Sequence, residues 1–233
     1  MGFYPPSQLV QDARRHGVDV HPPDVQRSTW ETVPEGDAPS SVRLGLRQIK
    51  GLDAEAGARI AAARPFRDMA DLARRAGLGP NALDALAAAG ALASLAGHRR
   101  QAAWSVAAVP VQRDLLLDAS PNEDAVPLPP PREGEAIVAD YAALRLTLGR
   151  HPLALLRATL ARRRYVPASA LRDLSHNVSA RCAGIVTHRQ RPGSAAGVVF
   201  LTLEDETGLV NVIVHPRLVD RQRRELLGPR LLG

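Results

Sequence analysis

Residues 198–215, VVFLTLEDETGLVNVIVH, are the stretch that most restricts how this chain can fold. Two short runs of β-branched and apolar residues, 198–203 and 209–214, are separated by a polar segment that ends at Gly208. Apolar runs joined by a short polar segment with a glycine are typical of a β-hairpin. The stretch therefore predicts two antiparallel strands with a tight connection.

The segments on either side extend this hairpin. Residues 181–189 predict a preceding strand, and the loop 191–194 joins it to the hairpin. A helix is expected over 216–227, and a further strand begins at Arg230. Three antiparallel strands, a helix and a fourth strand are typical of the five-stranded oligonucleotide-binding (OB) barrel. We therefore expect an OB fold over 177–233 that is truncated after the start of strand four.

The charge of the chain favours a polyanionic partner. There are 30 basic against 24 acidic residues, a net charge of +6, and Lys50 is the only lysine. Such an excess is common in nucleic-acid-binding proteins, although an arginine- and alanine-rich composition is also typical of a GC-rich coding bias. One cysteine, Cys182, excludes an internal disulfide and fits a reducing cytoplasm. No apolar run approaches a membrane span and no secretory signal begins the chain, so we expect a cytoplasmic protein outside the membrane.

Two helical hairpins are predicted in an alanine- and leucine-rich region. The sequence IKGLD, residues 49–53, joins an apolar segment to a helix expected over 54–64. This is the layout of a helix-hairpin-helix, in which backbone N–H groups at the start of the second helix can meet a phosphate without reading sequence. Gly51 would let the backbone approach closely, Leu52 would anchor the turn in the core, and Lys50 would add charge.

The second hairpin has the more regular turn. Helices are predicted over 66–76 and 80–90, on either side of the turn from Gly77 to Gly79, and no basic residue follows this turn.

Asp53 conflicts with phosphate binding at the first hairpin, because an N-cap carboxylate occupies the same donors. We expect the first hairpin to be the main phosphate contact and the second to pack against it, with Gly77 and Gly79 as further candidate DNA-binding residues. A purely structural pair of hairpins is the alternative.

The predicted barrel has its own candidate contacts with DNA. Arg181, Arg189 and Arg191 lie on its first strand and first loop, and OB folds bind single strands with strands two and three and with this loop. Phe200 is the only aromatic side chain of those two strands, and alternation places it on the face opposite Val199. Phe200 fits both a stacking platform and a core residue, so both interpretations stay open.

No catalytic or metal site is predicted. Glu204, Asp205 and Glu206 form an acidic run at the hairpin turn, where successive side chains diverge and are usually solvated. The seven histidines have no zinc-like spacing with Cys182, and neither a phosphate loop nor a serine nucleophile motif is present. We therefore expect no catalytic residue, no metal and no cofactor in this chain.

Four stretches, in this order, resemble the bacterial C-family DNA polymerases: FYPPSQLVQDARRHGVDVHPPDV, VRLGLRQIKGL, GRHPLALLR and VTHRQRPGSAAGVVFLTLEDETGLVNVIVHP. That family includes the replicative DNA polymerase III alpha subunit and its error-prone paralogue. The sequences of the four stretches resemble the error-prone paralogue most. The resemblance covers almost the whole chain and implies a C-terminal fragment of such a polymerase.

The patterns and the resemblance together predict an α+β, multidomain chain. Its expected regions are the end of the fingers region (1–41), a tandem helix-hairpin-helix module (42–108), a proline-rich linker (109–132), a helical connector (133–176) and the truncated OB fold (177–233). In the family, the palm domain holds two magnesium ions for nucleotidyl transfer. The resemblance places that domain upstream of every residue present here.

The expected function is DNA binding, to duplex backbone and single-stranded template, within an error-prone DNA polymerase of translesion synthesis and repair. Magnesium would belong to the absent palm, and this piece would bind DNA without polymerising. Other translesion or replisome proteins are expected partners. A truncated gene, a split gene and an incomplete sequence all fit this interpretation. A stand-alone DNA-binding or regulatory module and a fragment of the replicative paralogue are the alternatives.

Overall fold

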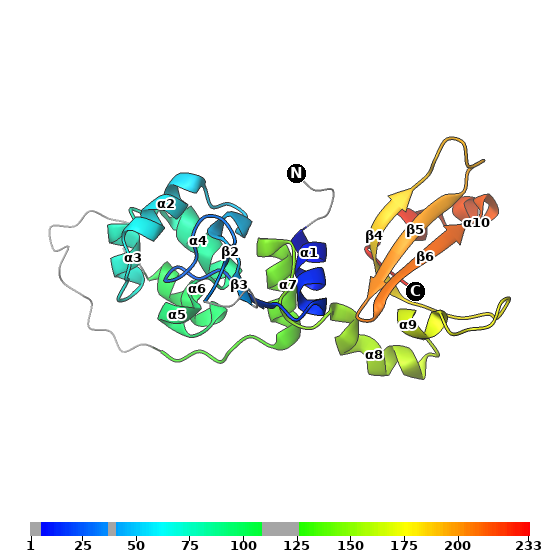
Figure 1. Cartoon of the computed structure of the whole chain (residues 1–233), viewed down its shortest axis with the longest axis horizontal. Coiled ribbons are helices and arrows are strands. Elements are labelled where there is room, and N and C mark those ends of the chain that lie inside the picture. The colour runs from blue at the N-terminus through cyan, green and yellow to red at the C-terminus, as the bar shows by residue number, and fades with distance from the viewer. Residues whose placement is uncertain (1–5, 37–40, 109–125) are drawn as a thin grey trace. The chain divides into compact units, whose positions relative to one another are not determined.

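The computed structural model describes residues 6–36, 41–108 and 126–233. The chain divides into two compact units, Met1–Gly149 and Arg150–Gly233. Helices occur in both units and an antiparallel sheet in the second, so the chain is an α+β protein (Figure 1). Most of the predicted linker 109–132 lies outside the described residues. Of the helices in the described ranges, none has both the length and the apolar character needed to cross a membrane.

The first unit opens with a helix and a small sheet. Helix α1 (Pro6–Arg15) precedes β1 (Asp19–His21), which pairs in parallel with β3 (Ser41–Arg43). Strand β2 (Val33–Pro34) pairs with the other edge of β3 in the antiparallel sense. This sheet brings the residues before the first hairpin into a fixed position beside it.

Two helical hairpins follow, as predicted. The first runs from η1 (Leu46–Gln48) into α2 (Ala54–Ala62), and the second from α3 (Met69–Arg75) into α4 (Pro80–Ala89). Helices α5 (Ala93–Ala96), α6 (Arg99–Ala107) and α7 (Glu133–Leu144) complete the unit. Polar N-caps explain where several of these helices begin, because the first backbone N–H groups of a helix lack partners within it. Asp68 is one such cap, accepting a 2.8 Å hydrogen bond from the backbone of Asp71.

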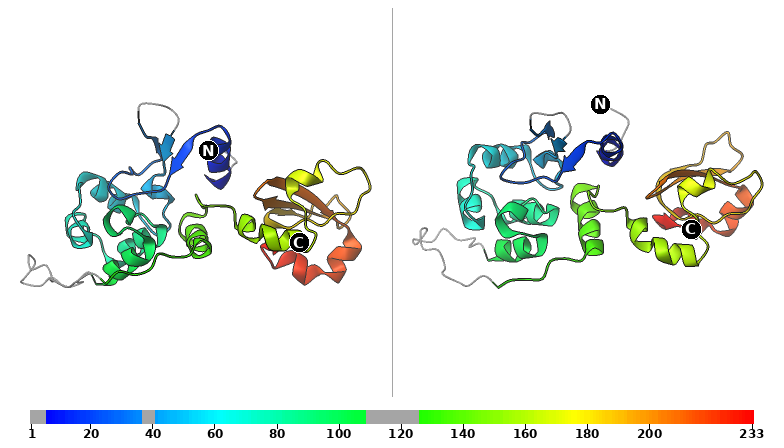
Figure 2. Two further views of the ribbon diagram at one scale, coloured as in Figure 1. Left: turned by 90° about the horizontal axis from the view of Figure 1, so that it is seen from below. Right: turned by 60° about the horizontal axis from the view of Figure 1, so that its bottom comes forward.

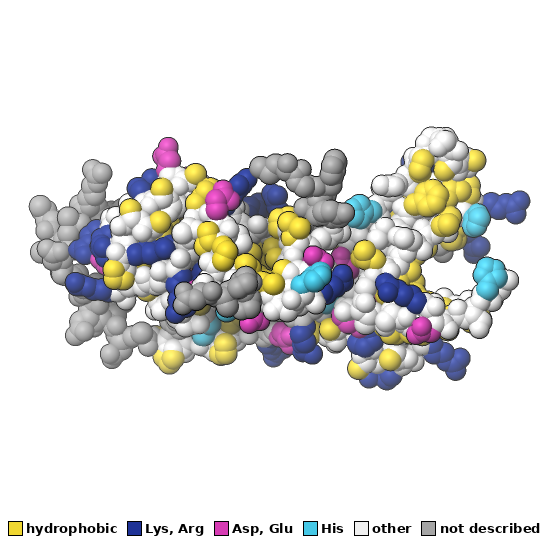
Figure 3. Space-filling model, viewed as in Figure 1, with side chains coloured by type: hydrophobic (Ala, Val, Ile, Leu, Met, Phe, Trp, Pro, Cys, Tyr) yellow, Lys and Arg dark blue, Asp and Glu magenta, His cyan; other side chains and the backbone are white. Residues whose placement is uncertain are grey.

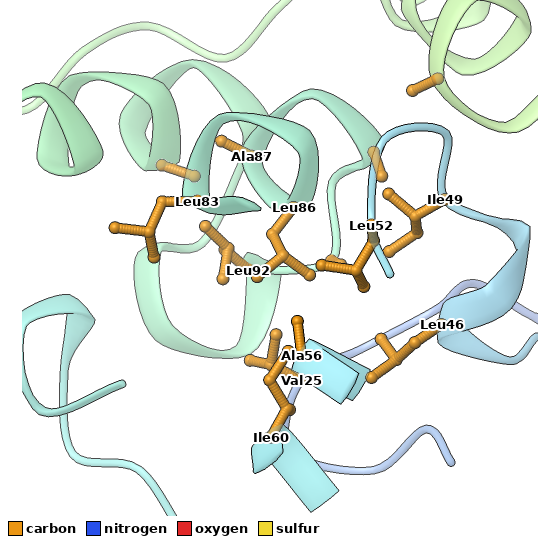
Figure 4. Close-up of a cluster of buried hydrophobic side chains, with 14 of the residues drawn as sticks. Val25, Leu46, Ile49, Leu52, Ala56, Ile60, Leu83, Leu86, Ala87 and Leu92 are labelled. Carbon is orange, nitrogen blue, oxygen red and sulfur yellow. The ribbon is translucent and has the colours of Figure 1, made fainter. Parts of the chain in front are cut away.

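The two hairpins close over one hydrophobic core (Figure 4). Leu46 and Leu52 from the first hairpin and Leu86 from α4 lie together there, with Ile60 of α2 beside them. Leu46, Ile60 and Leu86 are completely buried. Burial of a side chain of this size stabilises a fold by about 1.5–3 kcal/mol. The core therefore joins both hairpins into one body.

Helix α7 packs on this core although it was predicted as part of a separate connector, residues 133–176. The backbone N–H of Lys50 donates to the carbonyl of Ala143 at 2.9 Å, and the side chain of Gln48 donates to the carbonyl of Leu144 at 2.7 Å. The boundary between the two units, at Gly149, consequently divides the predicted connector.

The second unit is built around a four-stranded sheet with the order β6-β5-β4-β7. Helices α8 (Pro152–Arg162) and α9 (Ala168–Leu171) precede β4 (Gly184–Gln190), β5 (Val199–Asp205) and β6 (Gly208–Val214), and helices α10 (Pro216–Arg221) and α11 (Arg223–Leu227) precede β7 (Leu231–Leu232). The predicted hairpin and its antiparallel pairing are confirmed. The single helix predicted over 216–227 is wrong, because the backbone leaves the helical conformation at Gln222 (φ −123°, ψ 36°).

The sheet of the second unit curls, and α10 and α11 pack on one side of it (Figure 2). The core side of β5 carries Val199, Leu201 and Leu203, which pack with Val219 of α10 and Leu226 of α11. This alternation is the one predicted from the sequence.

Gly57 in the middle of α2 makes room for an aromatic ring. A Cβ atom at this position would lie 2.5 Å from Cε3 of Trp30. Trp30 belongs to the segment between β1 and β2, so its ring holds that segment against the first hairpin. The absence of a side chain at Gly57 is therefore a packing requirement.

We predict that Gly57→Ala destabilises the first unit by about 1–3 kcal/mol, because overpacking against Trp30 outweighs the gain in helix propensity of about 1 kcal/mol. Urea unfolding followed by tryptophan fluorescence measures this selectively, since both tryptophans, Trp30 and Trp104, lie in this unit. In a Trp30→Leu background, where Trp104 still reports, the same substitution should be neutral or stabilising. Equal destabilisation in both backgrounds would contradict the packing argument.

Candidate nucleic-acid interface

The turn of the first hairpin has the geometry expected of a helix-hairpin-helix. Gly51 has φ of +88°, a left-handed conformation that favours glycine. Leu52 is buried beside the core residues Ile49 and Leu86 (Figure 4), as predicted for an anchor of the turn. Lys50 is exposed. The turn thus presents a lysine and a glycine backbone to solvent while its leucine fixes it from within.

Asp53 caps α2, as its position predicted. Its carboxylate accepts a 2.6 Å hydrogen bond from the backbone N–H of Ala56. One of the donors that a phosphate would use is therefore occupied, and a negative charge lies at the start of the helix. This capping restricts how the first turn can receive an anion.

The second turn carries no such charge. Gly77 has φ of +57°, Leu78 is buried, and Gly79 is the N-cap of α4 without a side-chain hydrogen bond. Pro80 occupies the first turn of the helix, where its missing N–H costs nothing. Of the two turns, the second therefore offers the less obstructed helix start.

Arg59 connects the two hairpins. It lies on α2, and its Nε donates a 2.8 Å hydrogen bond to the carbonyl of Ala76, the residue just before the second turn. Its guanidinium group also reaches the carbonyl of Gly77. A cation from the first hairpin therefore stands beside the turn of the second, which the sequence spacing alone did not reveal.

The positive charge is concentrated in the second unit. Residues 150–233 contain 14 arginines and 6 acidic residues, a net charge of +8, whereas residues 1–149 contain 16 basic and 18 acidic residues, a net charge of −2. In Figure 3 arginine side chains project around the second unit, and apolar side chains gather over its sheet. The net charge of +6 for the whole chain hides this asymmetry, which becomes visible only once the unit boundary is known.

Phe200 lies on the open face of the sheet, so the core interpretation is wrong. It is 38% exposed and pairs in register with Ile213 of β6, which is 60% exposed. The next pair on this face is Thr202 and Asn211, whose side chains are joined by a 3.1 Å hydrogen bond. The face therefore combines an aromatic ring, an aliphatic side chain and hydrogen-bonding groups.

The three arginines predicted on the first strand and loop do not form one cluster. Arg181 precedes β4 and forms an isolated bridge with Tyr165, so its placement on the strand is wrong. Arg189 and Arg191 lie at the opposite end of this seven-residue strand, roughly 20 Å away at the usual rise per residue. The sequence lacks a boundary signal here, because residues 181–189 read as one continuous strand.

The acidic run at the hairpin turn is partly buried, contrary to the expected solvation. Asp205 is only 6% exposed and accepts hydrogen bonds from Thr207, Gly208 and Ala168, with Arg157 of α8 completing its partners. Burial raises the pKa of Asp205, but these hydrogen bonds outweigh it and hold the pKa below its ordinary value. We call this set of hydrogen bonds around Asp205 the clasp, because it joins α8 and α9 to the β5–β6 turn. The described residues include no group of three or more acidic, histidine or cysteine side chains arranged to hold a metal.

Comparisons with known proteins identify the context of these hairpins. A family model described as a helix-hairpin-helix motif matches residues 17–102. Along all of its length the chain is 58% identical to an error-prone DNA polymerase of Azoarcus sp. (strain BH72), 56% to one of Dechloromonas aromatica (strain RCB) and 52% to one of Alkalilimnicola ehrlichii (strain ATCC BAA-1101 / DSM 17681 / MLHE-1).

Over its whole length the chain is therefore similar to one segment of these error-prone DNA polymerases. It spans 23% of the length of each of these three relatives. The resemblance predicted from the sequence motifs is thereby confirmed. Both hairpin turns lie within the range that the helix-hairpin-helix motif matches.

We predict that Asp53→Asn raises duplex affinity about threefold. Asparagine retains the capping oxygen but removes the negative charge, and a charge at a helix start is worth about 0.3–1 kcal/mol. Fluorescence anisotropy with a labelled duplex measures the change, and Asp84→Asn on α4 is the charge-matched control. An unchanged affinity would show that phosphate does not approach the first turn.

We also predict that acid unfolds the second unit through Asp205 and Glu206. The Glu206 pKa is lowered by its hydrogen bond to Arg157. Since both folded-state pKa values are depressed, the stability that these groups contribute is complete above their ordinary pKa of about 4 and is lost as the pH falls below it.

Asp205→Asn should flatten this acid dependence and lower stability at neutral pH by about 2 kcal/mol, because hydrogen bonds to a charged group are lost. Hydrogen exchange of the β5 and β6 amides measures both effects. Glu225→Gln, on α11, is the control, and identical acid profiles for the parent and the Asp205→Asn variant would contradict the clasp.

Proposed function

We propose that this chain is the DNA-binding portion of an error-prone DNA polymerase that acts in translesion synthesis and DNA repair. The charge of the second unit carries the proposal. Within the described residues, Arg157 pairs with Asp205 and Glu206, Arg150 has an interaction of its own, and the other 12 of the 14 arginines form no ion pair with a carboxylate. A surface with this many uncompensated cations attracts a polyanion.

Residues 177–233 of the second unit are proposed to form the OB fold of the polymerase. The curled antiparallel sheet, with helices between β6 and β7, supports this assignment. Bases of a single-stranded template would stack on Phe200 on the open face. The backbone of that strand would pass the end of β4, where Arg189 pairs with Leu201 of the core side and Arg191 begins the loop. Arg181 would contact the strand separately, since it lies at the other end of β4.

The first unit is proposed to hold duplex DNA through backbone groups instead of net charge. Its net charge of −2 gives no long-range attraction to DNA, whereas amide N–H groups at a helix start bind phosphate locally. Lys50, Gly51 and Leu52 would form one contact, and Gly77 and Gly79 the other. Neither contact reads base edges, so binding would be independent of sequence.

The remaining assignments follow from the family. We propose the end of the fingers region for 1–41, the helix-hairpin-helix module for 42–108, the linker for 109–132, the connector for 133–176 and the OB fold for 177–233. Within the connector, α7 would belong structurally with the helix-hairpin-helix module, on whose core it packs. Nucleotidyl transfer and its magnesium would belong to a palm domain outside this chain, which would bind DNA without polymerising. Other translesion or replisome proteins are the proposed partners, in the cytoplasm.

The two proposed contacts predict different responses to substitution. Phe200→Ala should lower affinity for single-stranded DNA about tenfold, because stacking on an aromatic ring is worth about 1–3 kcal/mol per base. Lys50→Glu should weaken duplex binding more than single-strand binding. Anisotropy titrations of the full chain with both DNA forms, at several salt concentrations, measure these changes.

Matched controls lie in the same units. Leu231→Ala removes an apolar side chain that is exposed on β7, and Arg15→Glu makes a basic-to-acidic change on α1. Indistinguishable effects of Phe200→Ala and Leu231→Ala would contradict the stacking face. A parent chain that binds neither DNA form would overturn the proposed function as a whole.

A further inference from the structure

A small hollow in the second unit is bordered by three arginines. It has a volume of about 180 Å³ and lies between the end of β4 and α11. Arg189 is on β4, Arg191 begins the following loop, and Arg223 is the first residue of α11. Val199 and Val219 contribute apolar walls. Two strands and two helices thus converge on a pocket whose polar groups are almost entirely cationic.

A contact with the backbone of the unit positions the side chain of Arg189. The guanidinium group of Arg189 donates a hydrogen bond to the carbonyl of Pro229, while its Nε is buried and has no partner among the described residues. Arg191 folds back toward the end of its own loop, where its guanidinium nitrogen would lie 3.7 Å from a Cβ atom at Gly197. All three arginines nevertheless line the hollow.

No carboxylate within the described part of the chain forms an ion pair with any of the three, although Asp220 and Glu225 lie on the same two helices. The three guanidinium groups line one hollow, and like charges held close together repel one another. A buried N–H without a partner adds a further cost. An anion seated in the hollow would remove both penalties.

The size of the hollow identifies the class of anion. Pockets that enclose whole small-molecule ligands have volumes of about 300–1,000 Å³, so 180 Å³ suits a single group instead of a complete nucleotide. Guanidinium groups match the oxygen geometry of phosphate. We infer that this hollow is a phosphate site that takes one backbone phosphate of single-stranded DNA, with Arg223 as a contact from α11. The inference rests on the proposed function of the second unit.

The test uses the full chain with an oligo-dT strand. Arg223→Gln should lower affinity about fivefold, and the slope of log K against log salt should fall by about 0.7, the contribution of one single-strand phosphate. Arg224→Gln, next in sequence but outside the hollow, should change neither quantity measurably. Arg191→Gln should reproduce the Arg223→Gln effect.

A second measurement uses inorganic phosphate alone. Phosphate should raise the thermal midpoint of the second unit in the parent chain, relative to chloride at equal ionic strength, and Arg223→Gln should abolish this rise. A strong phosphate effect with an unchanged oligo-dT slope would assign the hollow to a free phosphate and overturn the backbone assignment.

Equal effects of Arg223→Gln and Arg224→Gln on DNA, together with no stabilisation by phosphate, would overturn the site. Single-strand binding by the parent would then still support the proposed function. Loss of binding in the parent itself would instead overturn that function, and the phosphate measurement would decide the hollow independently.

Discussion

The second, basic unit depends on the hydrogen bonds that the buried carboxylate of Asp205 accepts. Its two oxygens accept five hydrogen bonds, which come from the hairpin turn, from the start of α9 and from Arg157 on α8. A unit with a net charge of +8 is subject to considerable self-repulsion. The clasp opposes that repulsion at one point, where it joins α8 and α9 to the β5–β6 turn and thereby fixes the sheet that displays Phe200 and the arginines.

The first unit, for which duplex binding is proposed, is stabilised by a different set of contacts. Leu52 and Leu78 anchor the two hairpin turns in the core. Arg59 donates a hydrogen bond to the carbonyl just before the second turn, and the backbone of Lys50 donates one to α7. Because these contacts involve the backbone or the core, the exposed side chains of the turns remain free to vary in charge. A near-neutral unit can therefore still present organised amide groups.

Local patterns predicted the elements well, and long-range contacts were the part that sequence could not supply. The hairpin 198–215 and both helical hairpins follow from alternation, glycines and caps within short windows. Alternation also placed Phe200 opposite Val199, although only the structure showed which of these two faces is open. The burial of Asp205 depends on Arg157, which is 48 positions away in the sequence. A prediction from the acidic turn alone therefore expected a solvated side chain. The position of α7 depends similarly on carbonyl acceptors that no periodicity reveals.

The distribution of charge distinguishes the two proposed modes of DNA binding. Contacts made by arginine weaken steeply as salt rises, because they release condensed counterions, whereas amide groups at a helix start act over a short range and within a fixed geometry. The second unit would therefore govern how fast and from how far the chain is attracted to DNA, and the first would govern how the duplex is seated once it arrives. Neither mode depends on base identity. Discrimination between DNA forms would come from shape, since a flexible single strand can lay its bases on Phe200 while a duplex keeps them stacked and offers only its backbone to the hairpin turns.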